Sequence, residues 1–164
     1  MSVAIVYGST KGTTASVAEI IKNNFQEADL INIAKTTADK LNSYDGLIIG
    51  TSTYYDGQLQ DDWEAFDKEA LELNGKRVAF FGVGNQKRHS ETFNDGIGIL
   101  YELGVKKGAK IVGDKNPIDN YAFEASRAVV DSKFIGLIID KEVECDLLKD
   151  SVTKWTNLIK NDFK

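Results

Sequence analysis

Apolar residues form short continuous runs along the chain, and most of these runs lead into a polar or glycine-rich loop. Runs of this length without alternation are typical of strands that are buried on both faces of a parallel sheet. A shorter apolar segment predicts one further strand early in the chain. The predicted strands lie at residues 3–7, 28–33, 46–50 and 77–83, with a last strand that begins at 110–112 and resumes at 134–139.

Between the strands, apolar residues recur at helical spacing. We expect helices that begin near residue 13, span about 60–73, surround 93–101 and close the chain at 148–159, with one weak helical turn near 36–39. Alternating strands and helices are typical of βαβ units with a parallel sheet that is covered on both faces. The pattern therefore predicts an α/β fold of one domain, residues 1–164, whose last strand is interrupted at about 113–132.

Composition narrows the class of protein. The chain has 42% hydrophobic and 27% charged residues and a net charge of −5. It has no basic stripe with interleaved aromatic residues, which disfavours nucleic acid as a partner. No apolar run approaches the roughly 20 residues that a membrane span needs. Cys145 is the single cysteine, which excludes an internal disulfide. We expect a cytoplasmic protein that binds no metal, membrane or nucleic acid.

Three unusual loops follow predicted strands, at residues 8–14, 51–57 and 84–90. Because ligands of open α/β sheets lie beyond the carboxyl ends of the strands, these loops should converge on one edge. The first loop is rich in hydroxyl groups and precedes a helix N-terminus, which favours a phosphate. Tyr54 and His89 in the later loops could form a slot for a planar ring. Together the loops predict a site for a mononucleotide.

The same segments resemble a known family. Ser9-Thr10-Lys11-Gly12-Thr13-Thr14 resembles the phosphate loop of flavodoxins, (Thr/Ser)-x-Thr-Gly-x-Thr. Residues 50–63 and 81–86 are similar to the second and third loops of that family, and residues 121–126 and 134–137 to the inserted segment and last strand of its long-chain members. These motifs occur in order and at matching spacing. The chain is thereby identified as a member of the long-chain flavodoxin family.

The resemblance implies a doubly wound, five-stranded parallel sheet of order 2-1-3-4-5 and a non-covalently bound FMN. It also implies a low-potential carrier of single electrons between redox proteins, such as a reductase or oxidoreductase as donor and a low-potential enzyme as acceptor, rather than an enzyme. We expect such a carrier to be a monomer. The family's phosphate loop maps onto Ser9 to Thr14, although the position of Lys11 more often faces solvent.

The resemblance also assigns roles around the flavin ring. Tyr54 would stack on one face, and His89 stands where a second aromatic residue usually lies. Ser52 and Thr53 would line the ring and ribityl chain, the 55–56 peptide would face the flavin N5, and the backbone at 84–85 would bind the pyrimidine edge. The candidate cofactor-binding residues are Ser9, Thr10, Lys11, Gly12, Thr13, Thr14, Ser52, Thr53, Tyr54, Tyr55, Asp56, Gly57, Gly84, Asn85, His89 and Phe93.

This sequence departs from the family pattern mainly in its third loop. His89 replaces the usual tyrosine, Asn85 replaces the usual aspartate, and Lys87 and Arg88 add positive charge. Less negative and more positive charge should favour the anionic reduced flavin. We therefore expect a second reduction potential less negative than is usual for the family, by tens of millivolts. It should also depend on pH near the usual histidine pKa of about 6.5.

Other functions remain open at this point. An FMN-dependent NAD(P)H reductase of quinone-type or azo substrates could share the fold, but no G-x-G-x-x-G follows a strand. A phospho-receiver domain needs acids where Gly8, Ser9, Thr51 and Ser52 stand. A nucleotide hydrolase is disfavoured because the chain lacks G-x-x-x-x-G-K-[ST].

Overall fold

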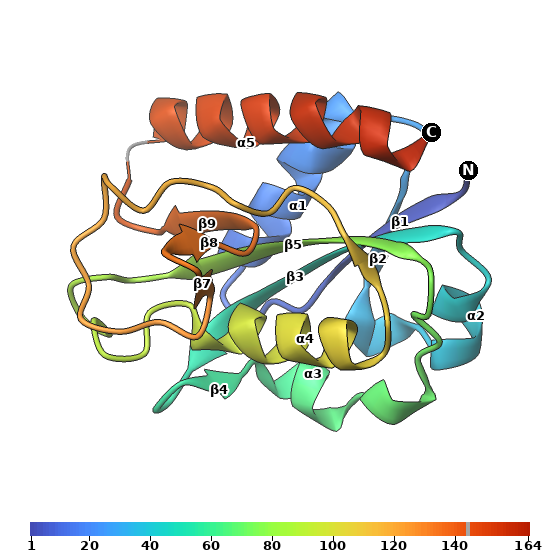
Figure 1. Ribbon diagram of the computed structural model, residues 1–164, viewed down its shortest axis with the longest axis horizontal. Coiled ribbons are helices and arrows are strands. Elements are labelled where there is room, and N and C mark those ends of the chain that lie inside the picture. The colour runs from blue at the N-terminus through green and yellow to red at the C-terminus, as the bar shows by residue number, and fades with distance from the viewer. Residues whose placement is uncertain (144) are drawn as a thin grey trace.

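A parallel β-sheet forms the centre of the computed structural model, which describes residues 1–143 and 145–164 (Figure 1). Its strands are β1 (Val3–Tyr7), β2 (Asp29–Asn32), β3 (Gly46–Tyr54), β5 (Arg77–Gly84), β6 (Lys110–Ile111) and β9 (Leu137–Asp140). The order is β2-β1-β3-β5-β6, and β9 also pairs with β5. β6 and β9 pair with opposite ends of β5, so they are the two parts of the interrupted last strand. The predicted order is confirmed.

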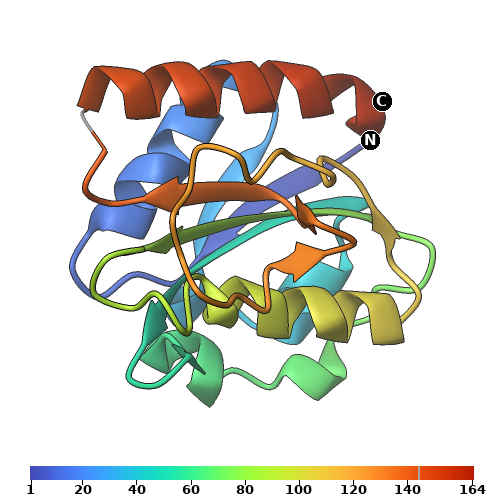
Figure 2. The ribbon, with the colours of Figure 1, turned by 60° about the vertical axis from the view of Figure 1, so that its left-hand side comes forward.

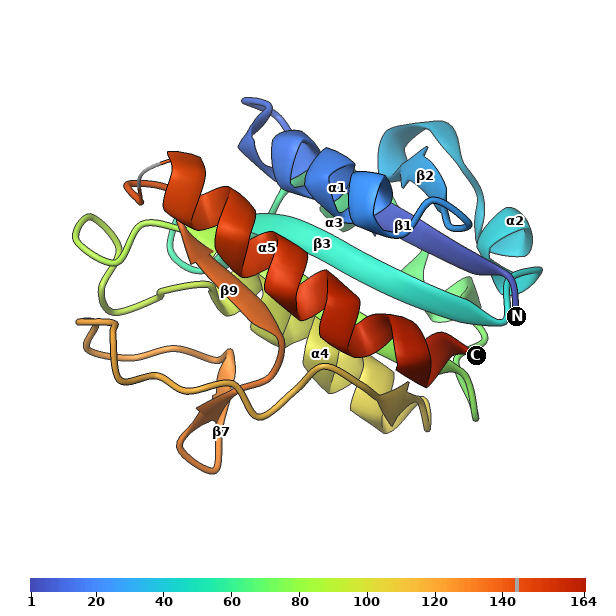
Figure 3. The ribbon, with the colours of Figure 1, turned by 90° about the horizontal axis from the view of Figure 1, so that it is seen from above.

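Helices cover both faces of the sheet (Figure 2). On one face, α1 (Thr13–Asn24) and α5 (Cys145–Ile159) lie alongside each other (Figure 3). On the other face lie α2 (Ala38–Asn42), α3 (Asp61–Ala65) and α4 (Asp95–Lys106). Three short 3₁₀ turns complete the helical segments: η1 (Ile33–Lys35), η2 (Lys68–Ala70) and η3 (Lys160–Phe163).

The two faces of the sheet explain the continuous apolar runs. Successive side chains of a strand point to opposite faces. In β1, Val3 and Ile5 pack in the core beneath α1 and α5, whereas Ala4 and Val6 pack in the core beneath α3 and α4. All four side chains are buried. A strand between two helical layers therefore needs apolar residues at every position, as the sequence pattern indicated.

The predicted helix at 60–73 is wrong in its length. α3 ends at Ala65 because Phe66 adopts an extended backbone. The Nζ of Lys68 donates hydrogen bonds to the backbone oxygens of Trp63 (2.7 Å), Glu64 (3.2 Å) and Phe66 (3.3 Å), which satisfies carbonyl groups that a longer helix would have used. The rest of the predicted helix is the η2 turn and an extended segment whose leucines are buried.

The last strand resumes later than predicted. Phe134 belongs to a small antiparallel hairpin, β7 (Val129–Val130) with β8 (Lys133–Phe134), which lies outside the main sheet. The hairpin turn at residues 131–132 has positive φ at both positions. Gly136 then lies so close to the backbone oxygen of Phe80 that a Cβ could not fit. The chain joins the main sheet at Leu137, directly after this close approach.

Candidate functional site

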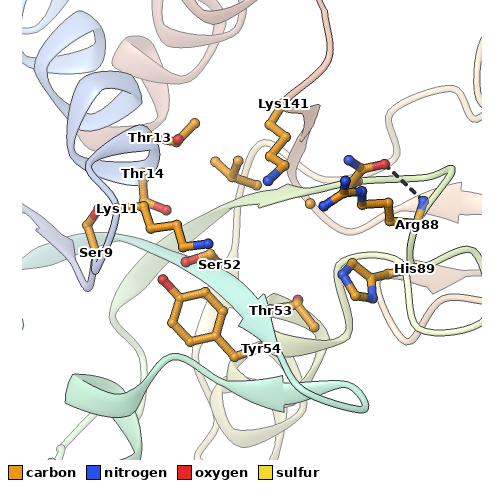
Figure 4. A pocket seen from close by; sticks show the side chains of 13 residues that line it. Ser9, Lys11, Thr13, Thr14, Ser52, Thr53, Tyr54, Arg88, His89 and Lys141 are labelled. Carbon is orange, nitrogen blue, oxygen red and sulfur yellow. Dashed lines mark hydrogen bonds between the residues drawn. The ribbon is translucent and has the colours of Figure 1, made fainter.

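A pocket lies at the carboxyl ends of β1, β3, β5 and β9, where the three loops meet (Figure 4). The convergence of these loops, which the strand pattern predicted, is confirmed. The pocket also lies where the connections after β1 and β3 diverge, the usual ligand position of such sheets. Its lining residues are Ser9, Lys11, Thr13, Thr14, Ser52, Thr53, Tyr54, Val83, Gly84, Asn85, Arg88, His89 and Lys141.

The first loop presents the N-terminus of α1 to the pocket. Gly12 precedes the helix with φ +91°, a left-handed conformation that favours glycine. Its N–H donates to Ser9 Oγ (3.1 Å), and its carbonyl accepts the first helical hydrogen bond from Ser16 (3.0 Å). The N–H groups at 13 and 14 lie in the first turn and have no partner within the helix. This turn has only uncharged side chains, so its positive dipole end fits an anion such as phosphate.

Gln60 anchors the first loop to α3. Its side chain is fully buried, and its Oε1 accepts hydrogen bonds from the N–H groups of Asp62 (3.1 Å) and Trp63 (3.3 Å). Its Nε2 donates to the hydroxyl of Thr10 (3.2 Å), so Thr10 is turned away from the pocket lining. The sequence analysis missed this role. The available signal was a glutamine at the start of the predicted helix at 60–73, because a side chain at that position could serve as an N-cap.

The second loop is the tip of a hairpin between β3 and β4 (Gln58–Leu59). Tyr54 lies at the end of β3, is half-buried and lines the pocket. Tyr55 has φ +52° and is 67% exposed, and its ring meets that of Tyr54 edge-on with centroids 6.3 Å apart. Tyr55, Asp56 and Gly57 do not line the pocket in this structure. Of the two tyrosines, Tyr54 is thus the one placed to contact a ring.

The third loop is organised by the side chain of Asn85, which is only 3% exposed. Its Oδ1 accepts hydrogen bonds from the N–H groups of Lys87 (3.1 Å) and Arg88 (3.0 Å). Its Nδ2 donates to Glu142 Oε1 (3.0 Å), and its backbone oxygen accepts from the N–H of His89 (3.0 Å). The carboxamide therefore shapes the loop and joins it to the segment after β9.

Lys141 is a pocket residue that the sequence analysis missed. It follows β9 directly, and its N–H donates to the backbone oxygen of Gly84 (2.8 Å). Its side chain lines the pocket with those of Lys11, Arg88 and His89. Among the residues that the structure describes, no carboxylate belongs to the lining. The available signal for Lys141 was its place immediately after a strand that ends at the same sheet edge as the three loops.

Phe93 lies in the core and not in the pocket lining. Its ring packs near those of Phe123 (5.2 Å between centroids), Tyr121 (5.9 Å) and Phe134 (6.4 Å), all from the segment between β6 and β9. The insertion thus covers the position that the sequence assigned to the cofactor. Among the described residues, no group of three or more His, Cys, Asp or Glu side chains could hold a metal ion, and no helix has the length and apolarity to cross a membrane.

Fold and pocket together define a doubly wound α/β protein with a pocket suited to a phosphate-bearing planar ligand beside its first strand. The family model described as Flavodoxin matches residues 5–155. The chain is 39% identical to a flavodoxin of Synechococcus elongatus, over 98% of this chain and 97% of that protein, and 36% identical to a flavodoxin of Helicobacter pylori, over 98% of each. A crystal structure of Fusobacterium nucleatum flavodoxin bound to flavin mononucleotide covers 99% of each chain, with a TM-score of 0.91 and 29% identity. The chain belongs to the flavodoxin family.

Proposed function

We propose that residues 1–164 form one FMN-binding domain that carries single electrons between redox proteins. The observation that supports this most is that one pocket joins a helix N-terminus suited to a phosphate with a tyrosine and a histidine suited to a flat ring. The structural relative from Fusobacterium nucleatum is described as bound to flavin mononucleotide. Bound FMN supplies two successive one-electron steps, and the chain holds and orients it.

The first loop holds the phosphate of FMN. The N–H groups at the start of α1 and the hydroxyls of Ser9, Thr13 and Thr14 donate hydrogen bonds to it, and Lys11 adds a positive charge. Thr10 and Gly12 act indirectly, because the hydroxyl of Thr10 is joined to Gln60 and Gly12 sets the direction of the chain into α1.

The second and third loops hold the ring. Tyr54 covers one face and His89 the other, while Ser52 and Thr53 lie along the ribityl chain. The backbone at 84–85 binds the pyrimidine edge. The peptide between Tyr55 and Asp56 lies at the exposed hairpin tip, where it can approach the edge of the ring without lining the apoprotein pocket. Gly57 follows this peptide and is buried against Asp95, which fixes the return of the hairpin. Phe93 supports the third loop from the core.

The test begins with absorbance. Purified protein, or apoprotein mixed with FMN, should show bands of bound flavin and quench flavin fluorescence. Tyr54→Leu should weaken FMN binding about 5- to 150-fold, because stacking of an aromatic ring on a base is worth about 1–3 kcal/mol. The matched control Tyr55→Leu, at an exposed position outside the lining, should change it far less. A protein that takes up no FMN would refute the proposal.

The carrier role has its own test. Mixing the flavin-loaded protein with NADH or NADPH alone in a stopped-flow instrument should give no fast reduction, whereas adding a flavodoxin reductase should give it. Fast direct reduction would instead establish an NAD(P)H-dependent reductase. We further infer a cytoplasmic monomer, because a carrier must leave the pocket mouth and the hairpin tip at Tyr55 free for successive redox partners. Analytical ultracentrifugation at micromolar concentration tests the monomer.

A further inference from the structure

The pocket is lined by positive side chains from three separate loops. Lys11 comes from the loop before α1, Arg88 from the loop after β5, and Lys141 from the end of β9. Figure 4 shows the side chains of Lys11, Arg88 and Lys141 extending from different sides into the space between these loops. The lining contains no Asp or Glu among the described residues. The positive charge is thus concentrated at the ligand position of a chain whose net charge is −5.

The arrangement is unfavourable until an anion enters. Like charges repel, and within the described part of the chain no carboxylate lies within 4.0 Å of the charged atoms of Lys11 or Arg88. Lys11 lies at the phosphate end of the pocket, beside the start of α1. Arg88 and Lys141 follow β5 and β9, on the far side of β3 from that helix end. They therefore lie toward the end of the pocket that we assign to the ring, where the oxidised cofactor has no net charge.

Hydrogen bonds fix the backbone that carries these two cations. The N–H of Arg88 donates to Asn85 Oδ1 (3.0 Å), and the N–H of Lys141 donates to the backbone oxygen of Gly84 (2.8 Å). The Nδ2 of Asn85 donates to Glu142 Oε1 (3.0 Å), which joins the two loops directly. An aspartate at position 85 could not make that bond and would place two carboxylates side by side. Asn85 is therefore a positioning residue for the cations around it.

We propose that Arg88 and Lys141 form a cationic pair that stabilises the negative charge gained by the ring end of FMN, so that reduction of the bound cofactor costs less free energy than it would without these two side chains. This inference rests on the proposed function. Each electron that arrives without a proton adds one negative charge to the bound cofactor, and the pair lies where that charge appears. The phosphate is charged in every oxidation state, so Lys11 affects overall affinity more than the potentials.

The test removes each charge while keeping a polar side chain of similar length. Arg88→Gln and Lys141→Gln should each weaken binding of reduced FMN about three- to tenfold relative to oxidised FMN. By linkage, this ratio lowers the potential by about 30 to 60 mV for one electron. Lys87→Gln is the matched control, because Lys87 carries the same charge in the same loop, is exposed and lies outside the lining. It should shift the potentials much less.

Both one-electron potentials are measured by spectroelectrochemical titration, and the Kd of oxidised FMN by fluorescence quenching. Equal shifts in all three variants would show a general effect of surface charge and overturn the inference, as would unchanged potentials in Arg88→Gln and Lys141→Gln. Either result can be obtained only if the wild-type chain binds FMN and the bound FMN is reduced in the titration. A wild-type chain that does not bind FMN would instead refute the proposed function.

The positioning role of Asn85 has a separate test. Asn85→Asp should lower the potential and weaken binding of oxidised FMN, because it removes the bond to Glu142 and introduces repulsion. The double variant Asn85→Asp with Glu142→Gln reverses the direction of that hydrogen bond and keeps the wild-type net charge. Recovery of both readouts toward wild type supports positioning. A double variant that stays at the values of Asn85→Asp would refute it.

Discussion

Replacing Gly12 by alanine tests how the backbone prepares the phosphate site. Gly12 has φ +91°, and a Cβ built there meets no atom within 4 Å. The added methyl group therefore causes no clash, and any effect comes from the conformational preference of an L-residue. Gly75 offers a matched control, because it has φ +75° and also has open space around its Cβ position. It lies in the loop before β5, at the opposite edge of the sheet from the pocket.

The left-handed conformation costs an L-residue about 1–2 kcal/mol. If the first loop keeps its conformation, Gly12→Ala lowers the free energy of unfolding by that amount, or roughly 2–4 °C in melting temperature per kcal/mol. If the loop relaxes, the lost geometry must be restored when the phosphate binds. The loss of stability and the loss of FMN binding energy should therefore total about 1–2 kcal/mol, a combined factor of about five to thirty.

The assay combines urea denaturation of the apoprotein with FMN titration followed by fluorescence. Gly75→Ala should lose about the same total, but all of it as stability, and should bind FMN with wild-type affinity. Two results would refute the reasoning. One is a Gly12→Ala variant that loses neither stability nor affinity. The other is a Gly75→Ala variant whose FMN binding is weakened as much as that of Gly12→Ala.

Three further predictions concern side-chain hydrogen bonds that stabilise the fold. Trp155→Phe removes the indole hydrogen bond to the Gly113 carbonyl (3.0 Å) and should lower the free energy of unfolding by about 1–3 kcal/mol. Urea denaturation measures this loss, and an unchanged urea midpoint would contradict the prediction. Thr53→Val removes the acceptor of a backbone N–H in the first turn of α4 (2.8 Å) and should destabilise the apoprotein by about 1–3 kcal/mol, whereas Thr53→Ser should retain most of the stability. The hydrogen bond from Tyr44 to Asp29 (2.6 Å) raises the pKa of Tyr44 to about 12. The stabilisation from this pKa shift is therefore complete below the unfolded-state pKa of about 10, and it is lost as the pH rises through about 12. Over this pH range the wild type should lose more free energy of unfolding than Tyr44→Phe. Identical pH profiles of the two proteins would argue against the linkage.

Much of the fold was predictable because the local pattern of apolar residues shows which faces of a strand or helix are buried. The run at residues 3–7 is apolar at every position because both faces of β1 are covered, and the spacing of apolar residues in α5 matches the face that packs on the sheet. The length of α3 was not predictable in this way. It depends on the Lys68 ammonium group, which satisfies the carbonyls at the helix end, and helix propensity does not record that interaction.

In the site, too, local sequence patterns predicted some features and missed others. The sequence could predict that the first loop belongs to the pocket, because a phosphate site of the proposed kind depends on a contiguous segment, from Ser9 to the start of α1. Phe93 does not line the pocket in this structure, because the insertion from a distant part of the chain covers it with other aromatic rings. The role of Asn85 also escaped sequence reasoning, which treated it as a change of charge, whereas its side chain joins two loops.

The sequence by itself determined the alternation of strands and helices, the convergence of three loops on one sheet edge and the family of the chain. These follow from local periodicity and from the rule that parallel strands end at the same edge. The tertiary structure alone decided that Lys141 enters the pocket beside Arg88, that Tyr55 faces solvent while Tyr54 lines the site, and that the last strand resumes only after the hairpin. Each of these depends on which distant segments meet in the folded chain, and a local pattern does not contain that information.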